Sequence, residues 1–97
     1  AVLAHPASGR SLQVYTTYPG LMVYTADHLS SEIPGLLGDV YRPFDGICLE
    51  CQHYPDAPHH ADFPSVLLRP GSIYHEQIVY HFKQDAPFPD IMELGRL

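Results

Sequence analysis

Alternation of apolar and polar side chains marks short strands along the chain. Residues 11–16 read Ser-Leu-Gln-Val-Tyr-Thr, in which Leu12 and Val14 alternate with more polar neighbours, a period of two that is typical of a half-buried strand. Alternation also predicts strands at 46–54 and 73–82, and runs of apolar or β-forming residues predict strands at 21–25 and 66–68. We therefore expect several short strands joined by irregular segments.

The last predicted strand, residues 73–82, is the longest. Ile78, Tyr80 and Phe82 recur at every second position, so they share one face of a strand and make it strongly apolar. In isolation such a face would leave a sizeable apolar stripe in water. We expect the 97 residues on their own to associate or aggregate.

Breaks in the pattern predict loops and little helix. Ten Pro and seven Gly are spread along the chain, and both residue types interrupt helices. Loops are predicted at 26–45 and 55–64, a turn at 69–72, and a flexible tail at 83–97. The fold class expected from these features is all-β.

Length and charge exclude several classes of protein. A chain of 97 residues is one segment of at most one domain, and it has a net charge of −6, which disfavours nucleic acid and anionic membrane surfaces as partners. No apolar run approaches the roughly 20 residues of a membrane span. The first residues, Ala1-Val2-Leu3-Ala4, resemble neither a natural start nor a signal peptide, so we expect the natural N-terminus to be missing.

Cys48 and Cys51 have the C-x-x-C spacing of some metal and redox sites, and His53, His59 and His60 follow them. In an extended strand, however, residues three apart point to opposite faces. No helix N-terminus follows to activate a redox pair. We therefore expect two reduced core cysteines and no metal, in a reducing compartment such as the cytoplasm, with a Cys2His2 zinc module as the remaining alternative.

Glu50 is the candidate catalytic residue. A lone carboxylate inside an otherwise apolar strand must be paired, protonated or used at a site, and such a group suits a general base. The alternative is a Glu on the solvated face of an edge strand. The hydrophobic pattern by itself leaves both open.

A longer set of motifs resembles the aldose 1-epimerases, the galactose mutarotases. Around Glu50 the motif is Gly46-Ile47-Cys48-Leu49-Glu50-Cys51-Gln52, followed by Tyr54-Pro55-Asp56-Ala57-Pro58, Phe63-Pro64 and Leu67-Leu68-Arg69-Pro70-Gly71. Upstream, Ser8-Gly9-Arg10, Val14-Tyr15-Thr16-Thr17, Pro19-Gly20 and Tyr24-Thr25 are similar to the preceding strands of that family. The resemblance covers residues 5–82, and its composite order is far more specific than any single piece.

The resemblance implies a fold and an activity. It implies that residues 1–97 are the C-terminal third of a large mutarotase-like β-sandwich, whose remaining N-terminal part would be the partner of this segment. The implied activity is an isomerase reaction that interconverts α and β anomers of hexoses such as galactose or glucose, without a cofactor. In the family the Glu of the Leu-Glu-x-Gln motif is the general base, which is Glu50 here. The acid His lies N-terminal to this chain, so we assign that role to none of its seven His.

Two positions depart from the family pattern. Met22 stands where the family commonly has a sugar-contacting Gln, and His59 stands where an Asn is expected. Met22 is therefore the candidate substrate-binding residue, but a thioether has none of the donors of an amide. Two functions stay open, an epimerase acting on a monosaccharide and a noncatalytic carbohydrate-binding relative.

Overall fold

The computed structural model describes residues 1–85 of the chain. The chain divides into two compact units, one made of Ala1–Thr17 with His75–Leu97 and the other of Tyr18–Tyr74. The second unit is thus inserted, in sequence, between the two halves of the first. The predicted tail at 83–97 falls largely on residues 86–97, outside the described part, although Lys83 and Gln84 belong to a strand.

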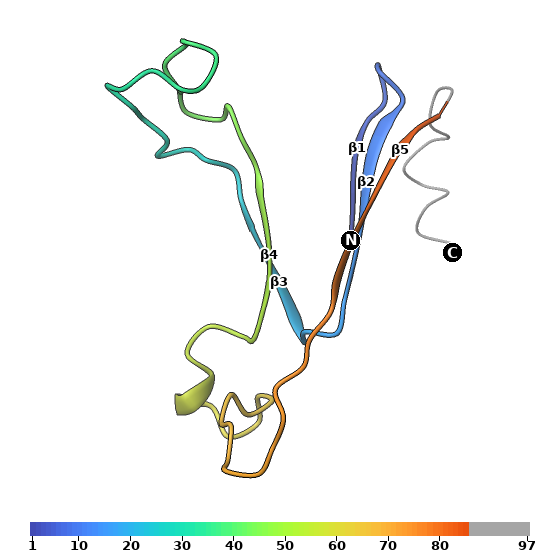
Figure 1. The fold of residues 1–97 in the computed structure, drawn as a ribbon, viewed down its shortest axis with the longest axis vertical. Helices are drawn as coiled ribbons and strands as arrows, with labels where there is room; N and C mark the ends of the chain where they lie inside the picture. The colour runs from blue at the N-terminus through green and yellow to red at the C-terminus, as the bar shows by residue number, and fades with distance from the viewer. Residues whose placement is uncertain (86–97) are drawn as a thin grey trace. The chain divides into compact units, whose positions relative to one another are not determined.

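The first unit is a three-stranded antiparallel sheet (Figure 1). Its strands are β1 (Val2–His5), β2 (Arg10–Thr16) and β5 (Ile78–Gln84). β2 lies in the middle, bonded to β1 on one side and to β5 on the other. The sheet therefore joins the beginning of the chain to a strand that follows the whole second unit.

A tight turn connects β1 to β2. The backbone N–H of Ser8 donates to the carbonyl of His5 at 3.1 Å, and that of Gly9 donates to Pro6 at 3.2 Å. Gly9 has a φ of 68°, a left-handed conformation that a residue without Cβ adopts at little cost. Ser8 Oγ also lies 2.8 Å from His5 Nδ1, so the turn is fixed by side-chain as well as backbone bonds.

The apolar face of this sheet follows the predicted alternation. Leu12 pairs with Leu3 on one side and with Phe82 on the other, and Val14 pairs with Tyr80. Val14 is only 3% exposed, whereas Phe82 is 76% exposed. The shared face predicted for Ile78, Tyr80 and Phe82 is confirmed by the register, but the core beneath it is small.

The second unit is built on a two-stranded antiparallel ribbon. β3 (Gly20–Tyr24) pairs with β4 (Cys48–Gln52), and a single 3-10 turn, η1 (Ala57–His59), follows. The predicted loop at 26–45 contains no strand or helix. Its ends are held by the carbonyl of Ala26, which accepts from the N–H of Leu29 at 3.0 Å and of Phe44 at 2.9 Å.

Two strand predictions differ from the structure, and one observed strand was not predicted. Residues 66–68 form no strand, and the last strand begins at Ile78 rather than at 73, whereas β1 was not predicted. The physical reason is the same in each case, because a strand exists only where its backbone finds a partner. Val66 to Leu68 are apolar but exposed and pair with no other strand, and the N–H of Leu67 donates instead to Ser65 Oγ at 3.1 Å. In contrast, β1 is stabilised by pairing with β2.

Apart from the 3-10 turn η1, the regular structure of residues 1–85 consists of strands in small antiparallel sheets. This confirms the β class expected from the sequence. Among the described residues, none belongs to a helix with the length and apolar character needed to cross a bilayer.

Candidate functional site

Glu50 occupies the centre of β4, directly opposite Met22 of β3. Residues opposite each other in an antiparallel pair have Cβ atoms about 4.5–5.5 Å apart, so the two candidate site residues are immediate neighbours. The Glu50 side chain is exposed. Within residues 1–85 its carboxylate has no hydrogen bond or ion pair, which leaves both oxygens available to a ligand.

The ribbon has two chemically different faces. Because side chains alternate along a strand, the register places one group of residues on the face of Glu50 and another on the opposite face. The first group, here called the Glu50 face, consists of Gly20, Met22, Tyr24, Cys48, Glu50 and Gln52. The opposite face consists of Leu21, Val23, Leu49 and Cys51. Polar groups are therefore gathered on the side that bears the carboxylate.

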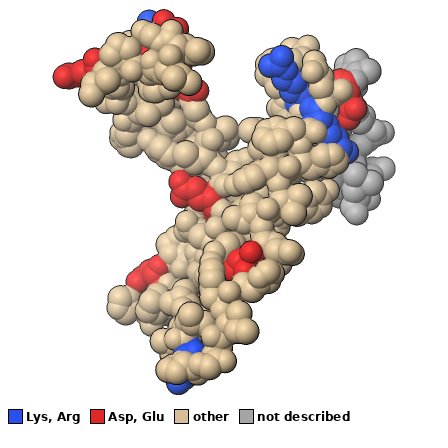
Figure 2. Space-filling model, in the orientation of Figure 1, with Lys and Arg blue, Asp and Glu red and all other residues tan. Residues whose placement is uncertain are grey.

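Glu50 is the only Asp, Glu, Lys or Arg in β3 and β4. Its charge is thus presented on a strand pair that is otherwise uncharged. Further acidic side chains appear in Figure 2, and those of the second unit all lie outside β3 and β4, at Asp27, Glu32, Asp39, Asp45, Asp56 and Asp62. An isolated carboxylate of this kind is suited to single proton transfers rather than to binding a cation between several carboxylates.

Aromatic rings border one end of the Glu50 face. Tyr54 follows β4, and its ring lies against Gly20, because a Cβ built on Gly20 would stand 2.9 Å from Tyr54 Cδ1. The ring of Tyr54 meets that of Phe63 edge to face, with centroids 5.1 Å apart. Phe63 in turn stacks on His60 at 4.6 Å. The rings of Tyr54, Phe63 and His60 thus form a row next to the ribbon, here called the aromatic wall.

Asp56 holds the two adjacent histidines of the following loop. His60 Nε2 lies 3.2 Å from Asp56 Oδ2, and His59 Nδ1 bonds to Asp56 Oδ1. Asp56 itself has a φ of 61°, a left-handed conformation that Asp tolerates better than most residues. Both imidazoles are exposed and contact the same carboxylate. These contacts therefore hold the loop around Asp56 in its conformation.

A second aromatic group lies at the start of β3. The ring of Tyr18 meets that of His53 edge to face, with centroids 5.5 Å apart, and its hydroxyl bonds to that of Tyr74. These contacts tie both ends of the second unit to the residue that follows β4. Their effect is to hold the ribbon rather than to add a group to the Glu50 face.

Comparison with known proteins identifies the family. A family model described as aldose 1-epimerase matches residues 1–81. The chain belongs to the aldose 1-epimerase family. The resemblance drawn from the motifs around Glu50 is thereby confirmed.

Individual relatives of this epimerase-family chain agree. The galactose mutarotase of Rattus norvegicus is 46% identical over 78 residues, covering 80% of this chain and 23% of the relative. That of Homo sapiens is 47% identical over 78 residues, with the same coverage. The aldose 1-epimerase of Escherichia coli strain K12 is 36% identical over 73 residues, covering 73% of this chain and 21% of the relative. The chain thus spans less than a quarter of the length of these curated relatives.

The cysteines of this epimerase-family chain do not form the core that was predicted. Cys48 is exposed and Cys51 is half-buried, and both are free thiols. They lie on opposite faces of β4, as residues three apart in a strand must. The prediction of two core cysteines is wrong for Cys48, which lies exposed on a ribbon of only two strands, β3 and β4.

No cluster of three or more potential metal ligands occurs in the described part of the epimerase-family chain. The zinc alternative required Cys48 and Cys51 to reach one ion together with histidines. The two thiols diverge across the strand, while His59 and His60 are engaged with Asp56. The geometry therefore offers nothing in favour of that alternative.

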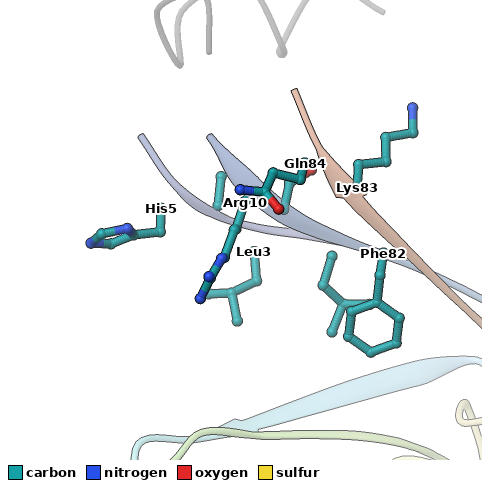
Figure 3. A pocket seen from close by; sticks show the side chains of 9 residues that line it. Leu3, His5, Arg10, Phe82, Lys83 and Gln84 are labelled. Carbon is teal, nitrogen blue, oxygen red and sulfur yellow. The ribbon is translucent and has the colours of Figure 1, made fainter. Parts of the chain in front are cut away.

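A hollow of about 650 Å³ lies elsewhere, in the first unit. Leu3 and Phe82 contribute apolar surface to it, and the side chain of Arg10 runs beside Leu3 (Figure 3). Lys83 extends to the other side of the sheet (Figure 3). The lining of the hollow contains no carboxylate and no thiol. We therefore favour the Glu50 face as the candidate site and regard the hollow as an uncovered part of the sheet.

Sequence reasoning assigned Glu50 and Met22 separately, and the structure places them side by side. The sequence reasoning assigned no role to Gln52 or Tyr54. The position of Gln52 on the side of Glu50 follows from simple alternation along β4, so its signal was present in the sequence. Tyr54 lies beyond the end of that strand, and its ring is placed by the contact with Gly20. The aromatic wall at Phe63 and His60 depends on contacts beyond the strand and had no local signal.

Proposed function

We propose that the natural protein containing this chain is an isomerase, an aldose 1-epimerase that interconverts the α and β anomers of hexoses such as galactose or glucose. The observation that carries the proposal is the exposed, unpaired carboxylate of Glu50 in the centre of a strand that belongs to a matched epimerase segment. Support also comes from the relatives named galactose mutarotase.

In the proposed reaction Glu50 is the general base. Its carboxylate takes the proton of the anomeric hydroxyl while an acid protonates the ring oxygen, so that the bond between the anomeric carbon and the ring oxygen breaks and an open-chain aldehyde forms. Rotation about the first carbon–carbon bond presents the other carbonyl face. Reclosure with the proton transfers reversed gives the opposite anomer, and no electron or group is lost. Proton transfer by positioned side chains is sufficient for this chemistry, and the proposal includes no cofactor.

The general acid and much of the sugar site belong, in this proposal, to the N-terminal remainder of the protein. The chain spans 23% of the length of its mammalian relatives, and its buried apolar residues within the described part are few, namely Val14, Ala26 and Ala57. Small sheets with one uncovered apolar face are stable when another layer packs on them. We propose that both units are parts of one larger β-sandwich in a cytoplasmic enzyme.

A noncatalytic carbohydrate-binding relative is the second candidate function. It is favoured by the register itself, because the residue opposite Glu50 is Met22, whose thioether offers only a weak acceptor and no donor. In that case sugars would bind saturably without any change in the rate of anomer exchange.

Polarimetry distinguishes the two candidates. Freshly dissolved α-galactose and α-glucose are followed with the full natural protein, with its Glu50→Gln variant and with buffer alone. A matched control is Glu32→Gln, since Glu32 is an exposed loop carboxylate outside the ribbon. We expect wild type and Glu32→Gln to accelerate mutarotation equally, and Glu50→Gln to lose roughly 100-fold or more of that acceleration. Rates equal to buffer for all proteins, with saturable sugar binding, would establish the second candidate instead.

A further inference from the structure

We propose that the side-chain amide of Gln52 is a specificity-determining group that hydrogen-bonds a hydroxyl of the sugar bound at Glu50. This inference rests on the proposed function, because it assumes that a monosaccharide occupies the Glu50 face. It assigns a role to a residue that the reaction itself does not require.

The first reason is the position of Gln52 along β4. It lies two residues after Glu50 and on the same face, so the two side chains leave the strand about 6.5–7 Å apart. A hexose ring with its hydroxyl groups spans a distance of this order. A sugar whose anomeric hydroxyl meets the Glu50 carboxylate therefore extends within reach of the Gln52 amide, provided that it lies along the strand.

The second reason is the chemistry of the neighbouring side chains. Met22, opposite Glu50, has no donor. Tyr24, at the far end of the face, accepts a hydrogen bond from the backbone N–H of His28 at 3.3 Å, and Cys48 has only a weak thiol donor. Gln52 is the one amide on the Glu50 face, with two donors and one acceptor.

The third reason is the surroundings of the amide. Gln52 is half-buried, and its side chain has no hydrogen bond to any of residues 1–85. Gly20 stands directly opposite and has no side chain, while the ring of Tyr54 covers Gly20. A polar group beside an aromatic ring is a common composition of small-molecule sites, in which a few polar groups fix orientation. The amide of Gln52 thus retains its full hydrogen-bonding capacity for a ligand.

The test compares kinetic constants in the full natural protein. Gln52→Met removes the amide at similar volume, Gln52→Glu keeps the shape but removes both donors, and Gln84→Met is the matched control on an exposed strand position of the other unit. Polarimetry gives KM and kcat for galactose and for its 2-, 3-, 4- and 6-deoxy derivatives. NMR titration gives the sugar affinity independently of turnover.

We expect both Gln52 variants to raise KM, or to weaken binding, roughly 10- to 100-fold, with a much smaller change in kcat. One deoxygalactose should show the same loss with wild type and no additional loss with Gln52→Met, which a merely structural role would not produce. The proposal is overturned if KM and affinity are unchanged, or if the Gln52 variants weaken every deoxy sugar as strongly as galactose.

The two proposals fail in different ways. A wild-type protein that binds galactose without accelerating mutarotation contradicts the enzymatic function but still tests Gln52 through affinity. Normal turnover with Gln52→Met contradicts only the role of Gln52. A protein that neither binds nor converts the sugar overturns both.

Discussion

Gly20 lies beneath the ring of Tyr54, so closely that a Cβ added to Gly20 would stand 2.9 Å from Cδ1 and 3.0 Å from Cε1 of that ring. The same added atom would lie 3.3 Å from the carbonyl oxygen of Gln52. The close approach fixes where the aromatic wall begins relative to the Glu50 face. Only the absence of a side chain at position 20 allows it.

Gly20→Ala should therefore displace the Tyr54 ring and lower the free energy of unfolding by about 1–3 kcal/mol, the usual cost of overpacking. Urea denaturation of the full natural protein measures this. Gly46→Ala is the matched control, since an added Cβ there meets nothing within 4 Å and the change restricts the unfolded chain. Equal stability of Gly20→Ala and wild type would contradict the packing described.

Asp56 supplies a second prediction, which separates backbone conformation from charge. Asp56→Ala should cost about 1–2 kcal/mol, because Ala disfavours the left-handed φ of 61° and because the exposed contacts to His59 and His60 are lost. Asp56→Asn should cost clearly less, since Asn tolerates that conformation. Thermal or urea unfolding compares them. If Asn and Ala cost the same, the backbone explanation is incorrect.

Thiol chemistry gives a third prediction. Cys48 is exposed on the Glu50 face, whereas Cys51 is half-buried on the other. Iodoacetamide should therefore modify Cys48 first, and the added group beside Glu50 should reduce the proposed mutarotase activity of the full natural protein roughly tenfold or more. Peptide mass spectrometry during the inactivation identifies the residue.

The control for this experiment is Cys48→Ala, which should keep its activity during the same treatment. Inactivation that proceeds unchanged in Cys48→Ala, or full activity of protein alkylated at Cys48, would refute the prediction.

A fourth prediction concerns association of the 97-residue chain expressed by itself. Phe82 is 76% exposed on the apolar face of β5, and we expect this face to drive self-association. Phe82→Gln should weaken association by roughly tenfold or more, whereas His81→Gln, on the opposite face, should change it little. Analytical ultracentrifugation measures both. A monodisperse wild-type monomer that unfolds cooperatively would contradict the expectation.

Local alternation was sufficient to predict the parts of the fold in which one face differs from the other. It predicted the strands around Val14 and Glu50 and the shared face of Tyr80 and Phe82, which the register confirms. The candidate base was found because a carboxylate is conspicuous in an apolar strand. The catalytic role of Glu50 and the binding role of Met22 stay predictions.

Pairing between distant segments was beyond the sequence pattern. The juxtaposition of Met22 and Glu50 depends on the β3–β4 register, which no local preference determines. β1 forms because β2 offers it a partner, while the apolar run at 66–68 finds none among residues 1–85. The exposure of Cys48 likewise depends on what covers the ribbon rather than on its neighbours in sequence.

The order β1-β2-β5 has a consequence for synthesis on the ribosome. β2 gains its second partner only when Ile78–Gln84 has emerged, after all of Tyr18–Tyr74. Until then the nascent chain carries the β1–β2 hairpin, in which the edge of β2 that later pairs with β5 is unpaired. An unpaired edge of this kind can pair with strands of other chains. A messenger RNA truncated before the codon for Ile78 would therefore encode a product with this edge unpaired, which is a substrate for chaperones and proteases.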